Sequence, residues 1–357
     1  MTSPFFSVCI PNFNYARYLG QTIRSVLDQT FQDFEIIVSD NASTDNSVEV
    51  VRSFQDRRIR LVQNSCNIGY APNLDKATES STGQYLILLS SDDIMKQGAL
   101  AEYAAIIRSL ERPRMDLVIS SAIDLINETG KVFDVKEGLS AELRAAMEKR
   151  GIIRDSRSNA ELEIYRGLDL FRAAMEGTMT NVGQFLSTCY SKGLFEKVCG
   201  YHSIMSVIPD AHFSHKLMQQ NPCVIFLRKS LFQYRVHGGG NYHQISKDMR
   251  VYCDRYLMTQ LYTQKELSHV GMNQRDLRQN FIRRFCLENP AFGLLTGRGG
   301  FALRACCFGW AVYPALMRRH WLVWCIPFLT LGYPALSVCY RLYGMLKRRR
   351  SPSNKPK

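Results

Sequence analysis

The chain has 357 residues, enough for one large domain or two smaller ones, and carries a formal net charge of +13. Its eleven cysteines include no CxxC pair, which argues against a zinc ribbon or a small disulfide-framed domain and indicates free thiols in a reducing compartment. The N-terminus lacks a basic segment followed by a long apolar stretch, so the sequence predicts no secretory signal.

The positive charge is concentrated near the C-terminus. Residues 289–357 hold eleven Lys or Arg and no Asp or Glu, whereas the other residues hold 34 basic and 32 acidic side chains. The basic residues of this tail flank apolar runs that contain Trp310, Trp321 and Trp324. This arrangement favours an anionic membrane surface over nucleic acid, because the basic residues bracket apolar helices and do not line a folded groove.

Short apolar runs alternate with helical periodicity over the first 120 residues. The runs predict strands at 5–10, 35–39, 59–62, 85–90 and 117–120, and the periodic segments predict helices at 15–29, 45–54, 72–80 and 98–110. This alternation predicts βαβ units and a mainly parallel sheet of the nucleotide-binding type. No GxGxxG or GxxxxGK[ST] motif is present, which argues against a dinucleotide-binding domain and a P-loop NTPase.

The apolar run 85–89 leads directly into Ser90, Ser91, Asp92 and Asp93. Such a run is typical of a strand buried on both faces, and ligands of open α/β sheets bind beyond the carboxyl ends of the strands. Mg²⁺ is commonly shared between one or two carboxylates and substrate phosphates. The stretch therefore predicts a metal–diphosphate site at Asp92 and Asp93, with an ordinary helix N-cap as the alternative.

Several motifs in order resemble the family 2 glycosyltransferases of the GT-A fold. Residues 10–47, 64–77 and 82–93 carry the close match, and a looser one continues through 184–203 and 209–217 to about residue 240. The resemblance implies a Rossmann-like, mainly parallel sheet flanked by helices over residues 1–245. It also implies transfer of a sugar from a nucleotide-sugar, with UDP favoured and with inversion, assisted by Mg²⁺ or Mn²⁺.

The resemblance assigns site residues one by one. Asp40 matches the carboxylate that accepts a hydrogen bond from the base, although an Asx-turn would also explain it. Arg235 and His237 match a segment that meets the diphosphate, with a hairpin end as the alternative. The turn and loop members of the donor-nucleotide set could also be explained as ordinary loop structure. The complete set is Pro11, Asn12, Asn14, Asp40, Asn67, Gly69, Asn73, Asp92, Arg235 and His237.

The acidic motif and the catalytic base complete the assignment. Many relatives have Asp where this chain has Ser90, which puts one sugar or ribose contact in doubt, and Asp93 remains the best single metal ligand. Asp210 resembles the catalytic base, the carboxylate that takes the proton of the acceptor hydroxyl. His212 and His215 are rival candidates, and either could equally be an interior histidine.

The rest of the chain is expected to be largely helical. Amphipathic helices are predicted at 140–150 and 159–176, in the region that shapes the acceptor side of relatives, and a helical linker is predicted at 246–296. Residues 297–357 are expected to form membrane-associating helices, with contact through 301–346. A helical pair embedded from the cytoplasmic face is favoured over a true span at 321–340, because two prolines interrupt that run. A soluble helical subdomain is the third possibility.

These observations lead to one expected function and two alternatives. The expectation is a bacterial enzyme of cell-surface polysaccharide synthesis, at the cytoplasmic face of the plasma membrane, that glycosylates a polyprenyl-linked or other saccharide acceptor without binding nucleic acid. A sugar-nucleotide nucleotidyltransferase would carry a G-G-x-G-T-R-L loop after the first strand, which is missing. A non-catalytic partner with a decayed donor site is favoured only by Ser90.

Overall fold

The structure is a computed structural model and describes residues 3–110, 116–152, 161–177, 179, 181–201, 205, 207–238, 249–291, 299–320 and 323. The chain divides into two compact units, Met1–His243 and Gln244–Lys357. The sequence-based division into 1–245, 246–296 and 297–357 stays a prediction. Each unit is described by itself.

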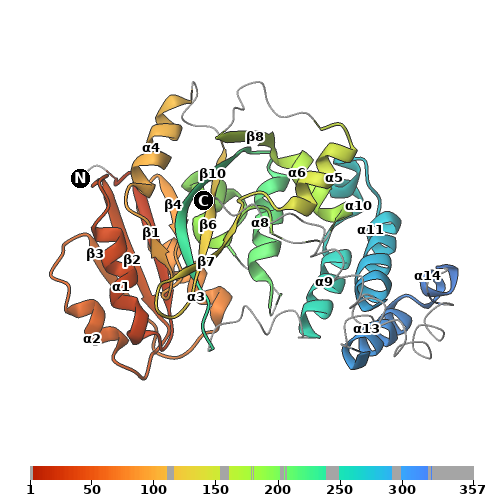
Figure 1. The fold of residues 1–357 in the computed structure, drawn as a ribbon, viewed down its shortest axis with the longest axis horizontal. Coiled ribbons are helices and arrows are strands. Elements are labelled where there is room, and N and C mark those ends of the chain that lie inside the picture. Colours follow the sequence, from red (N-terminus) through yellow and green to blue (C-terminus); the bar gives the residue numbers. More distant parts are fainter. Residues whose placement is uncertain are drawn as a thin grey trace, which may run out of the picture. The chain divides into compact units, whose positions relative to one another are not determined.

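The first unit is built on one ten-stranded sheet, shown in Figure 1. Its strands are β1 (Phe6–Asn12), β2 (Phe34–Asp40), β3 (Ile59–Gln63), β4 (Tyr85–Leu88), β5 (Ile94–Met95), β6 (Leu117–Ile126), β7 (Val132–Lys136), β8 (Leu162–Arg166), β9 (Cys189–Ser191) and β10 (Cys223–Arg235). The order is β3-β2-β1-β4-β9-β6-β10-β5, with β7 paired to β6 and β8 paired to β10. The predicted α/β class with a mainly parallel sheet is confirmed.

The strand directions decide where a site can form. Strands β1 to β4 are parallel to one another, and β6 is parallel to β10. Between these groups β9 runs antiparallel to both β4 and β6, so the two groups point the same way. The carboxyl ends of six strands therefore lie at one edge of the sheet, where ligands of such folds bind.

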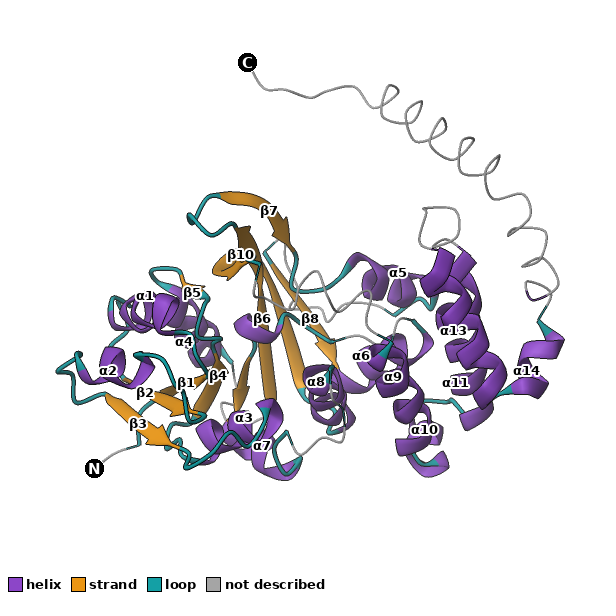
Figure 2. Cartoon of the chain, turned by 90° about the horizontal axis from the view of Figure 1, so that it is seen from below, coloured by secondary structure: helices purple, strands orange, loops and turns teal. Residues whose placement is uncertain are grey.

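Helices cover both faces of this sheet (Figure 2). They are α1 (Ala16–Leu27), α2 (Ser47–Arg52), α3 (Tyr70–Glu79), α4 (Ala99–Ser109), α5 (Ala141–Lys149), α6 (Gly167–Glu176), α7 (Lys192–Lys197) and α8 (Pro209–Gln219), with a 3₁₀ turn at Phe185–Ser187. Alternate side chains of β1 face opposite layers: Val8 and Ile10 join the core with Leu19 of α1, whereas the Cys9 thiol donates to the Ala77 carbonyl of α3 at 3.5 Å. All four side chains are fully or almost fully buried.

One predicted helix of the first unit is wrong in its first half. The helix expected at 159–176 begins only at Gly167, because Leu162–Arg166 forms strand β8, antiparallel to β10. Buried Ile164 and Tyr165 suit a sheet better than a solvent-facing helix. The strand predicted at 117–120 is the first part of β6, which continues to Ile126, and the structure adds β7 and the short strand β9, for which no element was predicted.

The second unit is helical in the part that the structure describes, as predicted. Its elements are α9 (Arg250–Leu261), α10 (Gln264–His269), α11 (Gln274–Phe281), a π-helical turn (Ile282–Glu288), α13 (Gly299–Val312) and α14 (Pro314–Arg319). Helix α10 starts with a capping box in which Thr263 accepts from the Glu266 backbone and Glu266 accepts from the Thr263 backbone. Rings of Tyr256, Phe281 and Tyr313 pack together at the centre.

The membrane expectation concerns mainly residues outside this description. The possible span at 321–340 and most of the 301–346 segment lie outside the described residues. Among the helices that are described, none combines the length and the apolar character that crossing a bilayer requires.

Candidate active site

The carboxyl ends of β1 and β2 form a closed turn network around Asp40. Asn12 Nδ2 donates to Asp40 Oδ1 at 2.9 Å, and Ser43 donates to both Asp40 oxygens, from its hydroxyl at 2.6 Å and its backbone nitrogen at 3.0 Å. Asn14 joins the same turn by accepting from the Thr44 nitrogen at 2.7 Å. Asp40 thus makes the Asx-turn contacts that were the alternative interpretation, and its recognition of a base stays a prediction.

One atom of this network has no partner. Asn12 is 1% exposed, its amide nitrogen is held by Asp40 and Ser43, and its Oδ1 is buried without a hydrogen bond. A buried polar oxygen without a partner costs free energy, on the order of 1–3 kcal/mol. This atom is therefore a ready acceptor for an N–H group of a ligand.

Asparagine side chains hold the next loop in place. Asn41 Nδ2 donates to Asn67 Oδ1 at 2.9 Å and to the Gly69 carbonyl at 3.2 Å, and its Oδ1 accepts from the Ile68 nitrogen. Asn73 accepts from Ser39 at 2.8 Å and donates to the Ser39 carbonyl at 3.1 Å. The loop with Asn67 and Gly69, and the first turn of α3 with Asn73, are therefore fixed at the carboxyl edge of β2, and Asn41 is a member that sequence reasoning missed.

Asp93 is the most buried carboxylate of the predicted metal site. Its side chain is fully buried, Oδ1 accepts from the Arg235 nitrogen at 2.9 Å, and Oδ2 has no hydrogen-bond partner. Burial raises the pKa of Asp93 well above its usual value, and the neighbouring charge of Asp92 raises it further. A positive charge at Oδ2 would act in the opposite direction and lower the pKa of Asp93.

His237 and Arg235 from the end of β10 surround this pair. His237 Nε2 and Asp92 Oδ2 are 2.9 Å apart, and the imidazole packs against the rings of Tyr15 and Tyr18. The Arg235 guanidinium is buried and bonded to the protein through all three nitrogens, to the carbonyls of Asp92 and Glu128 and to the Gln21 side chain. The structure thus brings Asp92, Asp93, Arg235 and His237 together, and contacts with a diphosphate stay predictions.

The residues present fit a divalent cation in one respect. Two adjacent carboxylates, one with an unpartnered buried oxygen, suit a hard cation whose other ligands are phosphate oxygens and water. Among the described residues no cluster of three or more His, Cys, Asp or Glu side chains is arranged to hold a metal ion. The protein alone therefore offers Asp92 and Asp93, and a bound diphosphate would complete the set.

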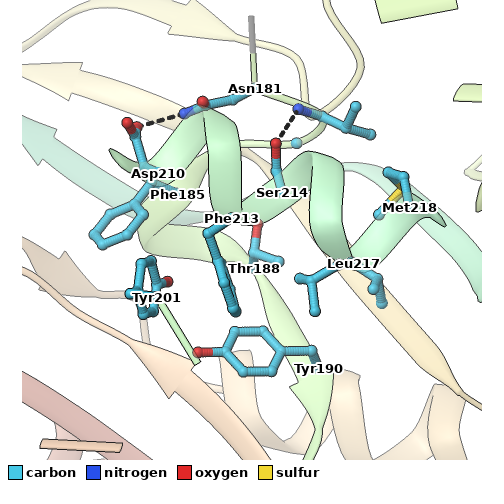
Figure 3. A pocket seen from close by; sticks show the side chains of 13 residues that line it. Asn181, Phe185, Thr188, Tyr190, Tyr201, Asp210, Phe213, Ser214, Leu217 and Met218 are labelled. Carbon is cyan, nitrogen blue, oxygen red and sulfur yellow. Dashed lines mark hydrogen bonds between the residues drawn. The ribbon is translucent and has the colours of Figure 1, made fainter. Parts of the chain in front are cut away.

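Asp210 lies in the first turn of α8 beside a small cavity (Figure 3). Asn181 Nδ2 donates to Asp210 Oδ2 at 2.5 Å. Burial raises the pKa of Asp210, and the Asn181 hydrogen bond acts in the opposite direction. The cavity, of about 20 Å³, is lined mainly by apolar side chains, among them Tyr190, Tyr201 and Phe213, and has room for about one water molecule, not for a sugar.

The rival bases occupy different surroundings. His215 is fully buried, and its ring packs edge-on against Phe171 with 6.1 Å between centroids. This position agrees with the alternative that His215 is an interior histidine. Burial and the charge of Lys216 lower the pKa of His212 to about 4. Asn181, the residue that orients Asp210, was missed because it falls in the 121–183 stretch, where no motif marks it.

Comparison with known proteins agrees with this architecture. Residues 7–157 match the model of "Glycosyl transferase family 2". A 102-residue stretch is 37% identical to the GalNAc(5)-diNAcBac-PP-undecaprenol beta-1,3-glucosyltransferase of Campylobacter jejuni, covering 28% of this chain and 33% of that enzyme. The first curated relatives are likewise matched over about two fifths of their own length.

Two solved structures share the fold across nearly the whole chain. S. aureus TarS 1-349 in complex with UDP-GlcNAc has a TM-score of 0.59 at 16% identity, covering 95% of this chain and 92% of that one. The mannosyltransferase PcManGT from Pyrobaculum calidifontis, in complex with GDP-Man and Mn²⁺, has a TM-score of 0.52 at 14% identity, covering 95% and 87%. Motifs, family match and fold agree: residues 7–157 match the family 2 glycosyltransferases, and the chain has a GT-A-type fold like that of these two structures.

Proposed function

We propose that this glycosyltransferase moves a sugar from a nucleotide-diphosphate sugar, with UDP as the nucleotide, to a hydroxyl of a saccharide acceptor with inversion. The observation that carries the proposal is the unpartnered Asp93 Oδ2, buried beside Asp92 at the carboxyl edge of the sheet. A cation held there would offset the charge of a donor diphosphate, and Mg²⁺ or Mn²⁺ suits its oxygen ligands.

The free Asn12 Oδ1 supports a pyrimidine nucleotide. A uracil ring carries one imide N–H, which can donate to that buried acceptor, while Asn14 and Pro11 belong to the same turn. The TarS complex with UDP-GlcNAc, which shares the fold, is consistent with this choice. The fixed loop with Asn67 and Gly69, together with Asn73 at the start of α3, would cover the nucleotide from the side of β2.

The proposed reaction uses Asp210 as the base and the pair Asp92 and Asp93 as cation ligands. Asp210 takes the proton of the acceptor hydroxyl while that oxygen attacks the anomeric carbon and the bond to the donor diphosphate breaks. One displacement on the face opposite the leaving group inverts the anomeric centre, and no covalent sugar–enzyme species forms. A cation held by Asp92 and Asp93 would act as a Lewis acid toward the leaving diphosphate.

The acceptor and the location belong to the same proposal. The Campylobacter relative is named for a polyprenyl-diphosphate-linked acceptor, and the present chain has a tail of eleven basic and no acidic residues over 289–357. We therefore assign the chain a polyprenyl-linked or other saccharide acceptor and a place on the cytoplasmic face of the plasma membrane, in surface-polysaccharide synthesis. Association with the membrane would use the 301–346 segment.

A thermal-shift and turnover panel tests the proposal. The full chain is mixed with UDP-, dTDP- and GDP-sugars with and without Mn²⁺, and nucleotide release is measured in the same samples. A ligand that binds the folded state raises the melting temperature, so a cation-dependent shift with a UDP-sugar is the expected result. An equal rise in melting temperature with every donor, whether or not Mn²⁺ is present, would contradict the cation role of Asp92 and Asp93.

A further inference from the structure

The 3₁₀ turn Phe185–Ser187 lies at the edge of the sheet where the candidate site forms. It directly precedes β9, which runs antiparallel to β4, so the turn meets the carboxyl end of β4, from which the acidic motif follows. Ser187 fixes the turn: its hydroxyl donates to the Ser121 carbonyl at 2.9 Å, and its own carbonyl accepts from the buried Tyr103 hydroxyl at 2.5 Å. The backbone that carries Phe185 is thus tied to β6 and α4.

Phe185 differs from the other aromatic side chains around Asp210. The cavity beside Asp210 is lined by the rings of Phe185, Tyr190, Tyr201 and Phe213. The last three are at most 3% exposed, whereas Phe185 is only partly buried. Its ring packs edge-on against Tyr201, 6.3 Å between centroids, and Figure 3 shows it at the side of the cavity where Asp210 lies. Part of an aromatic surface next to the candidate base is therefore open to a ligand.

The acceptor must come close to this surface if Asp210 is the base. A general base acts within hydrogen-bond reach, about 2.6–3.2 Å, of the hydroxyl that it deprotonates, so the sugar ring that carries this hydroxyl lies next to the Asp210 carboxylate. The cavity itself, of about 20 Å³, is too small for a sugar. The acceptor ring must therefore rest on the accessible side chains that border Asp210.

A pyranose ring suits an aromatic neighbour in that position. Its hydroxyls lie around the rim, and its C–H groups form an apolar face that packs against the face of an aromatic ring. We propose that the Phe185 ring is the platform on which the terminal sugar ring of the acceptor saccharide stacks while Asp210 takes the proton of the attacking hydroxyl. Phe185 is then a specificity-determining residue for the acceptor, and this assignment rests on the proposed function.

Kinetics of the full chain with simple glycosides test the assignment. The n-octyl glycosides of glucose, galactose, N-acetylglucosamine and mannose serve as acceptor probes at saturating UDP-sugar and Mn²⁺, and donor affinity is measured separately by calorimetry. Phe185→Leu removes the aromatic face and keeps the apolar character, whereas Phe185→Tyr keeps the face. Phe31→Leu is the matched control, at a partly exposed phenylalanine that packs against Phe6 at the start of β1.

The expected result is that Phe185→Leu raises the KM of the best glycoside by about 3- to 10-fold, the range of an aromatic stacking contact, and leaves the donor Kd within about twofold. Phe185→Tyr should keep the wild-type KM. An unchanged KM in Phe185→Leu, an equal rise in Phe185→Tyr or Phe31→Leu, or a donor Kd that rises in parallel would overturn the assignment.

The wild-type chain separates this assignment from the proposed function. If it binds a UDP-sugar but transfers to none of the glycosides, the saccharide platform at Phe185 is refuted and the donor site stands. If it binds no UDP-sugar at all, the proposed function is refuted, and the assignment with it.

Discussion

His237 Nε2 lies 2.9 Å from Asp92 Oδ2, although the two residues are 145 positions apart in the chain. The bond joins the end of β10 to the acidic motif after β4 and holds one carboxylate of the proposed cation site. Groups that orient metal-binding side chains are worth about 10- to 100-fold in metal affinity. The contact therefore makes a direct prediction for cation dependence.

His237→Phe keeps a ring against Tyr15 and Tyr18 and removes the nitrogen that reaches Asp92. We expect the Mn²⁺ concentration for half-maximal donor binding to rise about 10-fold or more, because Asp92 is no longer oriented. Titration of Mn²⁺ at fixed UDP-sugar measures it. His269→Phe, at an exposed position in α10, serves as control, and an unchanged Mn²⁺ requirement would show that the histidine does not act through Asp92.

Asp93→Asn separates stability from ligand binding. The raised pKa means that the folded state holds this proton more tightly than the unfolded state, so the free energy of unfolding falls as pH rises through that range. Asn removes the buried charge and can still accept from the Arg235 nitrogen. We expect the variant without ligand to melt at or above the wild-type temperature at neutral pH, while the Mn²⁺- and donor-induced shift disappears; a retained shift would contradict the cation role.

Asp210→Asn should slow transfer strongly without weakening the binding of the donor nucleotide. A positioned general base contributes roughly 100- to 10,000-fold in rate, so kcat should fall by that factor while the affinity for UDP stays the same. In the wild-type chain the rate should rise with pH through the raised pKa of Asp210, because only the deprotonated carboxylate accepts the proton. Loss of UDP binding in the variant would mean that Asp210 supports the fold.

The pH dependence of stability should report His212. Its pKa is lowered to about 4, so the unfolded state binds this proton first as pH falls. Stability is then full above the unfolded pKa of roughly 6.5 and is lost between there and about pH 4, by an amount on the order of 2–3 kcal/mol. Urea unfolding of wild type and His212→Gln at several pH values measures it: the variant should show a shallower slope, and identical slopes would exclude the effect.

Gly200→Ala probes the contact between α3 and the segment that precedes α8, in which Asp75 Oδ1 accepts from the Tyr201 nitrogen. Gly200 has a φ of +67°, and a Cβ there would lie 2.6 Å from Asp75 Oδ1. We expect a loss of about 2 kcal/mol or more in the free energy of unfolding, because the backbone conformation disfavours a side chain and the contact is too close.

Gly193→Ala is the matched control for that substitution. Gly193 lies in helix α7 and its Cβ would meet nothing within 4 Å, so this change should be neutral or stabilising by up to about 1 kcal/mol. Equal effects of the two changes, measured by urea unfolding, would show that the Gly200 turn is not under the constraint described.

Local patterns in the sequence were sufficient to predict the positions of the strands in the first half of the sheet. Strands β1 to β4 lie within about two residues of their predicted bounds, because each is a short apolar run that ends in polar residues. Strand β9 has only three residues, and it pairs with the distant strands β4 and β6. The sequence therefore contains no periodic pattern long enough to predict it.

The site shows the same limit. The acidic motif could be located from one stretch of sequence, but its contacts with Arg235 and His237 depend on how distant strands are placed. The Arg235 guanidinium bonds to Gln21, 214 positions away, which no spacing rule reveals. Asn181 belongs to no motif, and only its hydrogen bond to Asp210 in the fold distinguishes it from an ordinary surface residue.

Strand β9 has a consequence for how such a chain can diversify. This three-residue strand lies between β3-β2-β1-β4 and β6-β10, and the family match, residues 7–157, ends before β8, β9 and β10. The part of the chain beyond residue 157 carries Asp210, Arg235 and His237, so changes of sequence outside the family match can alter these candidate site residues while Asp40 and Asp93 stay the same.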